Sequence, residues 1–292
     1  MQPENASQLP PIRVAVAQIP GSQDPSTESI AGNAHAIRAE MRAAREAGAR
    51  LVQFHEGALS GYPSKKLMSG SGLDIIGEAD WSKVAWGVLD REFSGICELA
   101  RELGIWVVLG SLHRFSRNRR PCNSLLIVSD RGQLAGRYDK RFLSFTEISH
   151  MYTPGRRAQT FTVDGWTFGC AICIEINYPE LFLEYERLDV DCVLFSTYSE
   201  DSMFGIEAQG HAAGNSFWVT FSPPTQGAEA VPAGLIAPNG TWIRQANNSQ
   251  PQCVIVDLDQ NAPEAEKSVK CRRPWRRAAR EGSIYREHYA PE

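Results

Sequence analysis

One order of elements occurs twice in the first part of this chain: an amphipathic helix, a terminating residue and a short apolar strand. From Ile30 the apolar positions recur at spacings of three and four, and Gly48 and the segment LVQF (51–54) follow. A second helical pattern starts at Leu89 and is followed in the same way by IWVVLGSL (105–112). Helices that alternate with strands in this manner predict an α/β fold.

Strand patterns also open the chain and dominate its second half. IRVAVAQI (12–19) alternates and is rich in β-branched residues, while 179–188 and 203–215 have helical character. The further strand patterns are 124–129, 133–138, QTFTV, WTFGCAIC, 191–196, 217–222 and 253–259. This alternation predicts a mixed sheet or two sheets covered by helices, and two packed sheets suit the number of strands.

The chain reads as one domain with short extensions. No linker or change of composition interrupts residues 12–260, so we predict a single α/β domain there. Residues 1–11 form an N-terminal tail, and the charged, proline-containing residues 261–292 form a C-terminal arm. The Asn-Gly pair in LIAPNGTWIR (235–244) predicts a tight hairpin inside the domain.

Composition excludes several classes of protein. With 22% charged residues and a formal net charge of −4, the chain resembles neither a nucleic-acid-binding protein nor a disordered one. The N-terminus lacks the basic flank and apolar core of a signal peptide, and no apolar stretch reaches the ~20 residues that cross a bilayer. Seven scattered cysteines, an odd number, indicate free thiols in a reducing compartment. We therefore expect a cytoplasmic protein without a membrane partner.

Two cysteines, Cys170 and Cys173, lie close together in GCAICIEINYPE (169–180). A redox pair usually opens a helix, and a zinc site needs two further ligands at suitable spacing, so two core thiols are the ordinary alternative. Cys173 differs because it ends a strand directly before a turn, where backbone N–H groups favour a thiolate and an oxyanion. Alternation places the two side chains on opposite faces, so we expect only Cys173 to reach a given pocket.

A cysteine nucleophile needs a base, and FHEGALSGYP offers two adjacent candidates, His55 and Glu56. Both follow a buried strand, where α/β sheets tend to bind ligands, but neighbouring residues face opposite sides and only one can serve. Burial would raise the pKa of a carboxylate there and suit it to general-base work. Taken alone, either residue is more often a solvated loop group.

The stretch GRYDKRFLSFTEISHMYTPG (136–155) contains Lys140 after a strand-like segment and Glu147 in the loop that follows. An ammonium near a thiolate lowers the pKa of that thiol and stabilises negative charge on a carbonyl oxygen. Surface lysines are common, so Lys140 becomes a candidate catalytic residue only in combination with the other two stretches.

Together these stretches resemble the amidase-like branch of the nitrilase superfamily of carbon–nitrogen hydrolases, whose hallmark is a Glu–Lys–Cys triad in that chain order. FHEGALSGYP resembles the glutamate motif, YDKRFL…E…PG the lysine motif and GCAICIEINYPE the cysteine motif. The likeness extends to VAVAQ, NSLLIVSDRGQLAGRYDK and LIAPNGTWI, so it covers nearly the whole domain.

The resemblance implies a four-layer α-β-β-α sandwich and a thiol hydrolase that cleaves a C–N bond of a small amide. It implies Cys173 as nucleophile and Glu56 as base, with Lys140 and the N–H of Ile174 holding the oxyanion. Glu147 would help to place the water that hydrolyses a thioester, and no metal or organic cofactor is required. An N-carbamoyl amide hydrolase, a nitrilase, a non-catalytic binding protein of the same fold and a redox protein stay open as alternatives.

Several positions depart from the family pattern. His55 stands where proline is frequent, and Ile174 stands where nitrilases tend to carry tryptophan and many amidases tyrosine, which argues against a nitrile substrate. Glu175 stands where an acidic residue is usual, and we expect it to be structural. In the segment HAAGN, His211 and Gly214 replace an arginine and a glutamate, so an ion pair of the family is missing and the local packing must differ.

Substrate selection is expected from loops around 57–68, 142–152 and 196–206. The candidate pocket residues are Tyr62, Phe145, Tyr198 and Glu200. Ordinary packing explains the aromatic residues equally well, and an acidic residue at the start of a helix is commonly solvated.

The C-terminal arm contains KCRRPWRRAAR (270–280), in which six basic residues surround one tryptophan. Nucleic-acid binding is one interpretation, but the acidic overall balance favours a solvated arm or one that crosses to a partner subunit. Such segments commonly reach a second copy in the family, which implies a homodimer or a larger homo-oligomer.

Overall fold

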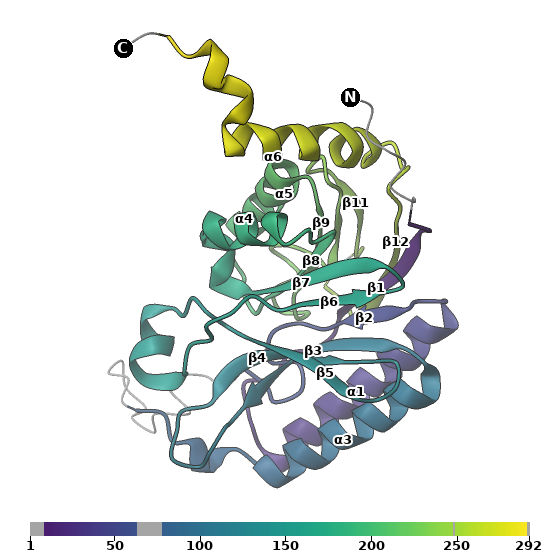
Figure 1. Cartoon of the computed structure of the whole chain (residues 1–292). Helices are drawn as coiled ribbons and strands as arrows, with labels where there is room; N and C mark the ends of the chain where they lie inside the picture. Colours follow the sequence, from purple (N-terminus) through teal and green to yellow (C-terminus); the bar gives the residue numbers. More distant parts are fainter. Residues whose placement is uncertain (1–8, 63–77, 248, 291–292) are drawn as a thin grey trace.

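The computed structural model describes residues 9–62, 78–247 and 249–290. Within these residues the chain forms two six-stranded sheets packed face to face, with helices on the outer face of each (Figure 1). The four-layer α-β-β-α sandwich implied by the family resemblance is therefore confirmed.

The first sheet contains the N-terminal strands and the last strand of the domain, in the order β12-β1-β2-β3-β4-β5. Neighbours β1, β2 and β3 are parallel, whereas the other pairs are antiparallel. Its strands are β1 (Ile12–Gln18), β2 (Leu51–Gln53), β3 (Trp106–His113), β4 (Cys122–Val128), β5 (Leu134–Asp139) and β12 (Gln252–Leu258). Because β5 runs in the same direction as β2, the residues that follow these two strands lie at the same end of the sheet.

The second sheet has the order β11-β10-β9-β8-β7-β6. Here β7, β8 and β9 are parallel, and the remaining pairs are antiparallel. Its strands are β6 (Thr160–Val163), β7 (Trp166–Ile172), β8 (Cys192–Ser196), β9 (Trp218–Ser222), β10 (Gly234–Ile236) and β11 (Trp242–Gln245).

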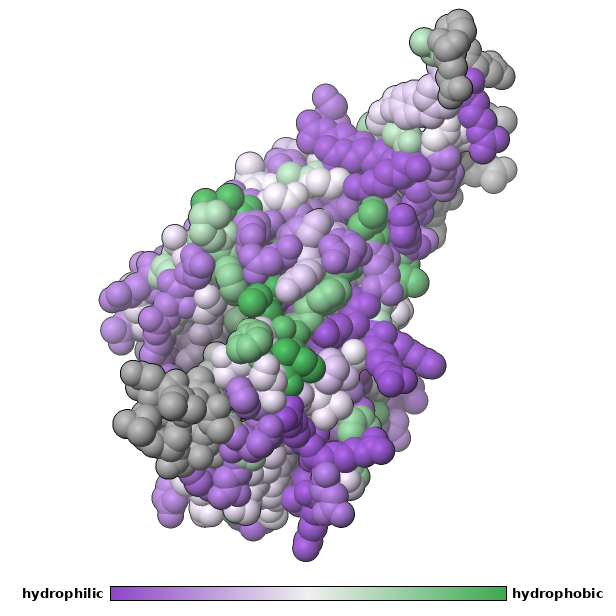
Figure 2. All heavy atoms as spheres, turned by 90° about the vertical axis from the view of Figure 1, so that its left-hand side faces the viewer, coloured by the Kyte–Doolittle hydropathy of each residue, from purple (hydrophilic) through white to green (hydrophobic). Residues whose placement is uncertain are grey.

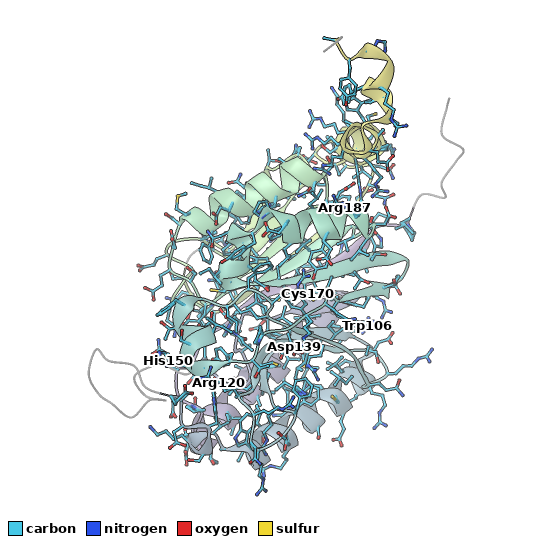
Figure 3. The ribbon with its side chains drawn as sticks, turned by 60° about the vertical axis from the view of Figure 1, so that its left-hand side comes forward. Trp106, Arg120, Asp139, His150, Cys170 and Arg187 are labelled. Atoms are coloured by element: carbon cyan, nitrogen blue, oxygen red, sulfur yellow. The ribbon has the colours of Figure 1, made fainter. Side chains whose placement is uncertain are left out.

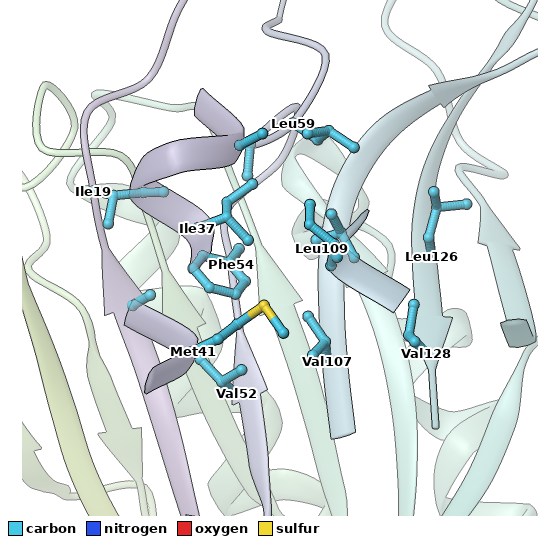
Figure 4. Packing of buried hydrophobic residues seen from close by; sticks show 14 of the residues in the cluster. Ile19, Ile37, Met41, Val52, Phe54, Leu59, Val107, Leu109, Leu126 and Val128 are labelled. Atoms are coloured by element: carbon cyan, nitrogen blue, oxygen red, sulfur yellow. The ribbon is translucent and has the colours of Figure 1, made fainter. Parts of the chain in front are cut away.

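Two pairs of helices cover the sandwich, and a fifth helix, α6, lies in the C-terminal arm. The helices are α1 (Thr27–Glu46), α3 (Trp86–Leu103), α4 (Pro179–Arg187), α5 (Met203–Asn215) and α6 (Arg273–Glu281). Helices α1 and α3 lie over the first sheet, while α4 and α5 cover the second (Figure 1). Figure 4 shows Ile37 and Met41 of α1 packed near Val52 and Phe54, so the helical stripe seen in the sequence is the face that meets the sheet.

A third apolar cluster fills the space between the sheets, and buried polar side chains tie the two sheets together within it. Gln53 at the end of β2 donates to the carbonyl of Phe195 at 2.9 Å and to the hydroxyl of Ser196 at 3.0 Å, and it accepts from Thr220. Because buried polar groups are costly unless paired, these bonds fix the register of one sheet on the other. Gln53, which makes these bonds, precedes Glu56 by three residues in the chain.

The glycines that the sequence pattern placed after the first two helices adopt left-handed backbone, with φ of 82° at Gly48 and 62° at Gly104. The Asn-Gly prediction is only partly right. Strands β10 and β11 do pair antiparallel, but five residues (237–241) connect them instead of a two-residue turn. In the described residues no helix is long and apolar enough to span a membrane. The cytoplasmic location stays a prediction.

Candidate active site

A buried carboxylate stands at the end of β2, at the edge where the two sheets meet. The Glu56 side chain is fully buried. Its Oε1 accepts hydrogen bonds from the Asn123 amide at 2.7 Å and from Lys140 Nζ at 3.0 Å, and its Oε2 accepts the backbone N–H of Tyr198 at 3.0 Å. Both oxygens therefore act as acceptors, and the side chain is held from three directions.

The ammonium of Lys140, directly after β5, bridges two carboxylates. Its Nζ lies 3.0 Å from Glu56 Oε1 and 2.9 Å from Glu147 Oε1, and all three side chains are at most 1% exposed. Burial lowers the pKa of Lys140, but the charges of Glu56, Cys173 and Glu147 outweigh burial and raise that pKa well above its usual value. Lys140 thus stays a cation at the centre of the cluster.

Glu147 opens a single π-helical turn (Glu147–Met151) that the sequence pattern did not predict. Burial raises the pKa of its carboxyl group, and Lys140 more than offsets this, so the pKa lies below its ordinary value. The carboxylate also accepts from the Tyr62 hydroxyl at 3.0 Å and from the Ser144 N–H at 2.8 Å. Glu147 is therefore a fixed anion beside Lys140.

The adjacent histidine faces away from this cluster. The ring of His55 is buried, and its Nδ1 donates to the carbonyl of Glu56 at 2.8 Å. Its Nε2 has no hydrogen-bond partner in the described part of the chain. Burial lowers the pKa of His55 to about 4, so the ring is neutral. Of the two adjacent candidates, only Glu56 reaches Lys140.

Cys173 sits where β7 gives way to a turn. The strand ends at Ile172, one residue earlier than the pattern indicated, and Cys173 opens a 3₁₀ turn (Cys173–Asn177). Its φ of 53° lies in the left-handed region, which non-glycine residues rarely adopt. The first N–H groups of such a turn, that of Ile174 among them, have no acceptor within the turn. Cys170, inside β7, is fully buried between the sheets (Figure 3).

Burial dominates the acidity of the Cys173 thiol. Desolvation, reinforced by the charge of Glu56, raises its pKa to about 12, although Lys140 and the Thr197 hydroxyl act in the opposite direction. Lys140 does lower the pKa of this thiol, as expected from the sequence, but desolvation outweighs that effect. A thiol with this pKa is protonated at neutral pH, so its attack on carbon requires a base beside it.

Glu175 joins the lysine segment to the cysteine turn. Its buried carboxylate accepts from the N–H groups of Arg141 at 2.6 Å, Phe142 at 3.1 Å and Ile172 at 2.8 Å. The hydroxyl of Tyr138 donates to the same group at 2.8 Å. The structural role expected for Glu175 follows from these contacts.

His211 and Gly214, the two residues of α5 that depart from the family pattern, make contacts with other parts of the same chain. His211 stacks on Phe182 with ring centroids 3.8 Å apart and donates through Nε2 to the carbonyl of Ile176 in the cysteine turn at 2.7 Å. The carbonyl of Gly214 accepts from Arg276 and Arg280 of α6, each at 3.2 Å. The arm therefore packs on its own chain at the end of α5. Its crossing to a second subunit stays a prediction.

The pocket candidates divide into two groups. Tyr62 bonds to Glu147 and stacks on Tyr198 at 5.3 Å, so both rings border the cluster. Phe145 is 83% exposed and Glu200 is also exposed. Figure 2 shows the face of the molecule that lies on the left in Figure 1. Apolar side chains gather at its centre, with hydrophilic ones around them. Residues 63–68 of the first loop lie outside the described residues.

Two contacts of the cluster were absent from the sequence analysis. Asn123, at the start of β4, orients Glu56, and Thr197, directly after β8, bonds to the Cys173 thiol. Asn123 begins a stretch that carried the family likeness, but its role depends on β4 lying near the end of β2. No local pattern contains that information.

The two sheets and their helices are the fold of the nitrilase superfamily. The chain belongs to the carbon–nitrogen hydrolase family, whose family model matches residues 13–266. The family predicted from the three motifs is therefore confirmed.

Several named proteins are similar to this chain at low sequence identity. Hydrolase MT0498 of Mycobacterium tuberculosis (strain CDC 1551 / Oshkosh) is 26% identical over 274 residues, which is 85% of this chain and 89% of that protein. Deaminated glutathione amidase of Mus musculus is 28% identical over 116 residues, 34% of each chain. A solved amidase from Nesterenkonia sp. superposes with a TM-score of 0.71 at 17% identity, over 90% of this chain and 96% of that one.

A variant of the amidase from Nesterenkonia sp. AN1 shows covalent addition of the acetamide moiety of fluoroacetamide at its active-site cysteine. It superposes with a TM-score of 0.72 at 18% identity, over 92% of this chain and 96% of that one. At this level of identity the likeness establishes a shared fold.

Proposed function

We propose that this protein is a thiol amidase that hydrolyses a small non-peptide amide through a thioester on Cys173. The observation that carries the proposal is the buried bridge in which Lys140 Nζ contacts Glu56 at 3.0 Å and Glu147 at 2.9 Å, at the strand ends next to Cys173. A lysine and two glutamates are seldom buried together without a task, since each charge is costly to desolvate.

In the first half-reaction the Cys173 sulfur attacks the amide carbonyl carbon while Glu56 takes the thiol proton. The raised pKa of the thiol makes this proton transfer necessary, and it leaves Cys173 neutral until the substrate binds. Lys140 and the Ile174 N–H stabilise the negative charge on the carbonyl oxygen. The C–N bond then breaks, and Glu56 returns its proton to the departing ammonia or amine.

In the second half-reaction water attacks the thioester. Glu56 accepts the proton of that water, and Glu147, held by Lys140 and Tyr62, helps to position it. The C–S bond breaks, the thiolate of Cys173 regains a proton from Glu56, and a carboxylic acid leaves. Every atom of the reaction comes from the amide, water and these side chains.

An amide is favoured over a nitrile for two reasons. Ile174 occupies the position after the nucleophile, where nitrilases of the resembled family tend to carry tryptophan. Relatives named for their activity are amidases, namely deaminated glutathione amidase and the Nesterenkonia enzyme.

The test is incubation with a panel of primary amides, N-carbamoyl compounds and nitriles, followed by measurement of ammonia and carbon dioxide and by intact-mass analysis. We expect ammonia from amides and an acyl adduct that maps to Cys173 and is missing in Cys173→Ala. The matched variant Cys170→Ala should keep both adduct and turnover. Carbon dioxide release would favour the carbamoyl alternative, and turnover that survives Cys173→Ala would contradict the proposal.

A further inference from the structure

Four arginines surround one hollow at the outer edge of the first sheet, apart from the Glu56 cluster. This arginine pocket has a volume of about 510 Å³. The side chains that define it are Arg119, Arg137, Arg156, Arg157, Phe115 and Asp139. None of them belongs to the proposed catalytic machinery.

The pocket opens on the face of β5 that points away from the second sheet. Tyr138 lies in the core between the sheets, and strand alternation therefore turns Arg137 and Asp139 to the opposite face. Figure 3 shows Asp139 at the end of β5 and Arg120 in the loop that also carries Arg119. Because β5 is the edge strand of the first sheet, the arginine pocket lies at that edge, where Gln159 also lines it.

Positive charge exceeds negative charge in this hollow. Asp139, its one lining carboxylate, is already paired with Arg137 through contacts of 2.7 Å and 3.1 Å. Arg119, Arg156 and Arg157 make no side-chain hydrogen bond or ion pair with any residue that the structure describes. Three guanidinium groups therefore line one hollow without an anion to neutralise them.

The segment that carries two of these arginines is fixed in place. The Thr153 N–H donates to the carbonyl of Pro121 at 2.8 Å, and the Gly155 N–H donates to the carbonyl of Lys140 at 2.9 Å. A Cβ at Gly155 would lie 2.1 Å from the carbonyl oxygen of Asp139, so only glycine permits this close approach. Arg156 and Arg157 are consequently held next to β5 by backbone contacts.

An aromatic ring completes the pocket. Phe115 is 58% exposed, the Arg137 guanidinium lies 4.7 Å from its centroid, and the His113 ring meets it edge-on at 5.1 Å. This arrangement holds the ring in place while leaving an apolar surface beside the three free cations. The pocket can therefore contact both a charged group and a flat organic group.

We propose that the arginine pocket binds a small molecule that carries a phosphate group. Guanidinium forks match the oxygens of a tetrahedral phosphate, which carries nearly two negative charges and three acceptor oxygens. The volume of 510 Å³ falls within the range of about 300–1,000 Å³ typical of small-molecule sites. This site is additional to the amidase activity and does not depend on it.

The test is isothermal titration of the whole protein with inorganic phosphate, phenyl phosphate and malonate at one fixed ionic strength, because exposed charges are screened by salt. The test variant combines Arg119→Gln, Arg156→Gln and Arg157→Gln. A control variant with the same charge change combines Arg45→Gln, Arg101→Gln and Arg131→Gln, which are exposed arginines outside the pocket. Thermal unfolding verifies that both variants fold.

We expect at least one phosphate compound to bind, with affinity at least tenfold weaker in the pocket variant and within twofold of wild type in the control. Equal binding of both phosphates would identify the free anion as ligand, whereas tighter binding of phenyl phosphate that Phe115→Ala removes would identify a phosphate ester. The proposal fails if neither phosphate binds, if malonate binds as tightly, or if the control variant loses affinity equally.

Discussion

The carboxylate of Glu175 accepts the backbone N–H of Arg141 at 2.6 Å, although the two residues lie 34 positions apart. The same carboxylate accepts the N–H of Ile172 at 2.8 Å. The residue after Lys140 and the residue before Cys173 are thereby attached to one side chain. The distance between Cys173, the proposed nucleophile, and the ammonium of Lys140, the proposed oxyanion ligand, depends on this attachment.

Replacing Glu175 with glutamine should therefore damage both stability and activity. An amide offers one acceptor oxygen where the carboxylate offers two, and we expect the free energy of unfolding to fall by about 1–3 kcal/mol. Urea unfolding and kcat/KM measure the two effects. The exposed Glu180→Gln provides a control, expected to change stability by less than about 0.5 kcal/mol. Equal behaviour of the two variants would argue against the attachment.

Removing the ammonium of Lys140 should lower the free energy of unfolding more than removing one of its carboxylate partners. In Lys140→Met the carboxylates of Glu56 and Glu147 stay buried without a cation, and we expect a loss of about 3–5 kcal/mol in unfolding free energy. Adding Glu147→Gln to Lys140→Met should restore part of that stability while turnover stays low. Denaturant unfolding of the single and double variants checks this, and a double variant that is less stable than Lys140→Met would refute it.

Glu147 should make the free energy of unfolding decrease as the pH falls into the acidic range. Its pKa in the folded protein lies below the ordinary value of 4.5, so the folded state favours the carboxylate. The resulting stabilisation is present above the unfolded pKa and is lost as pH falls through the lower, folded pKa. Urea unfolding between pH 7 and pH 3 should show a smaller decline in Glu147→Gln than in wild type. Parallel curves would show that Glu147 contributes nothing.

The Cys173 thiol should react slowly with iodoacetamide in the free protein. Because burial raises its pKa to about 12, the thiolate fraction and the alkylation rate should rise about tenfold per pH unit from pH 7 to pH 10, without a plateau. Glu56→Gln removes a charge that raises this pKa and should accelerate the reaction at a given pH. Peptide mass spectrometry follows Cys173 against the exposed Cys271, and a plateau below pH 9 would contradict the burial argument.

Local patterns predicted most of the helices and strands and the chain order of the proposed site, but not the π-helical turn at Glu147. The three-and-four spacing from Ile30 marks the face of α1 that packs on the sheet, and the turn after β7 marks Cys173. The contact of Asn123 with Glu56 could not be derived in this way, since it depends on strand order in the sheet. The net direction of the Cys173 pKa shift could not be predicted from the sequence for a related reason, because burial is a property of the assembled layers.

The left-handed backbone at Cys173 separates what folding favours from what the proposed reaction needs. A residue with a side chain at φ of 53° costs about 1–2 kcal/mol that glycine would not. A library randomised at position 173 and selected for thermal tolerance alone should therefore enrich glycine, whereas selection for growth on an amide nitrogen source should return cysteine. The two selections would measure, at one position, how much thermal stability the protein loses by carrying a reactive sulfur there.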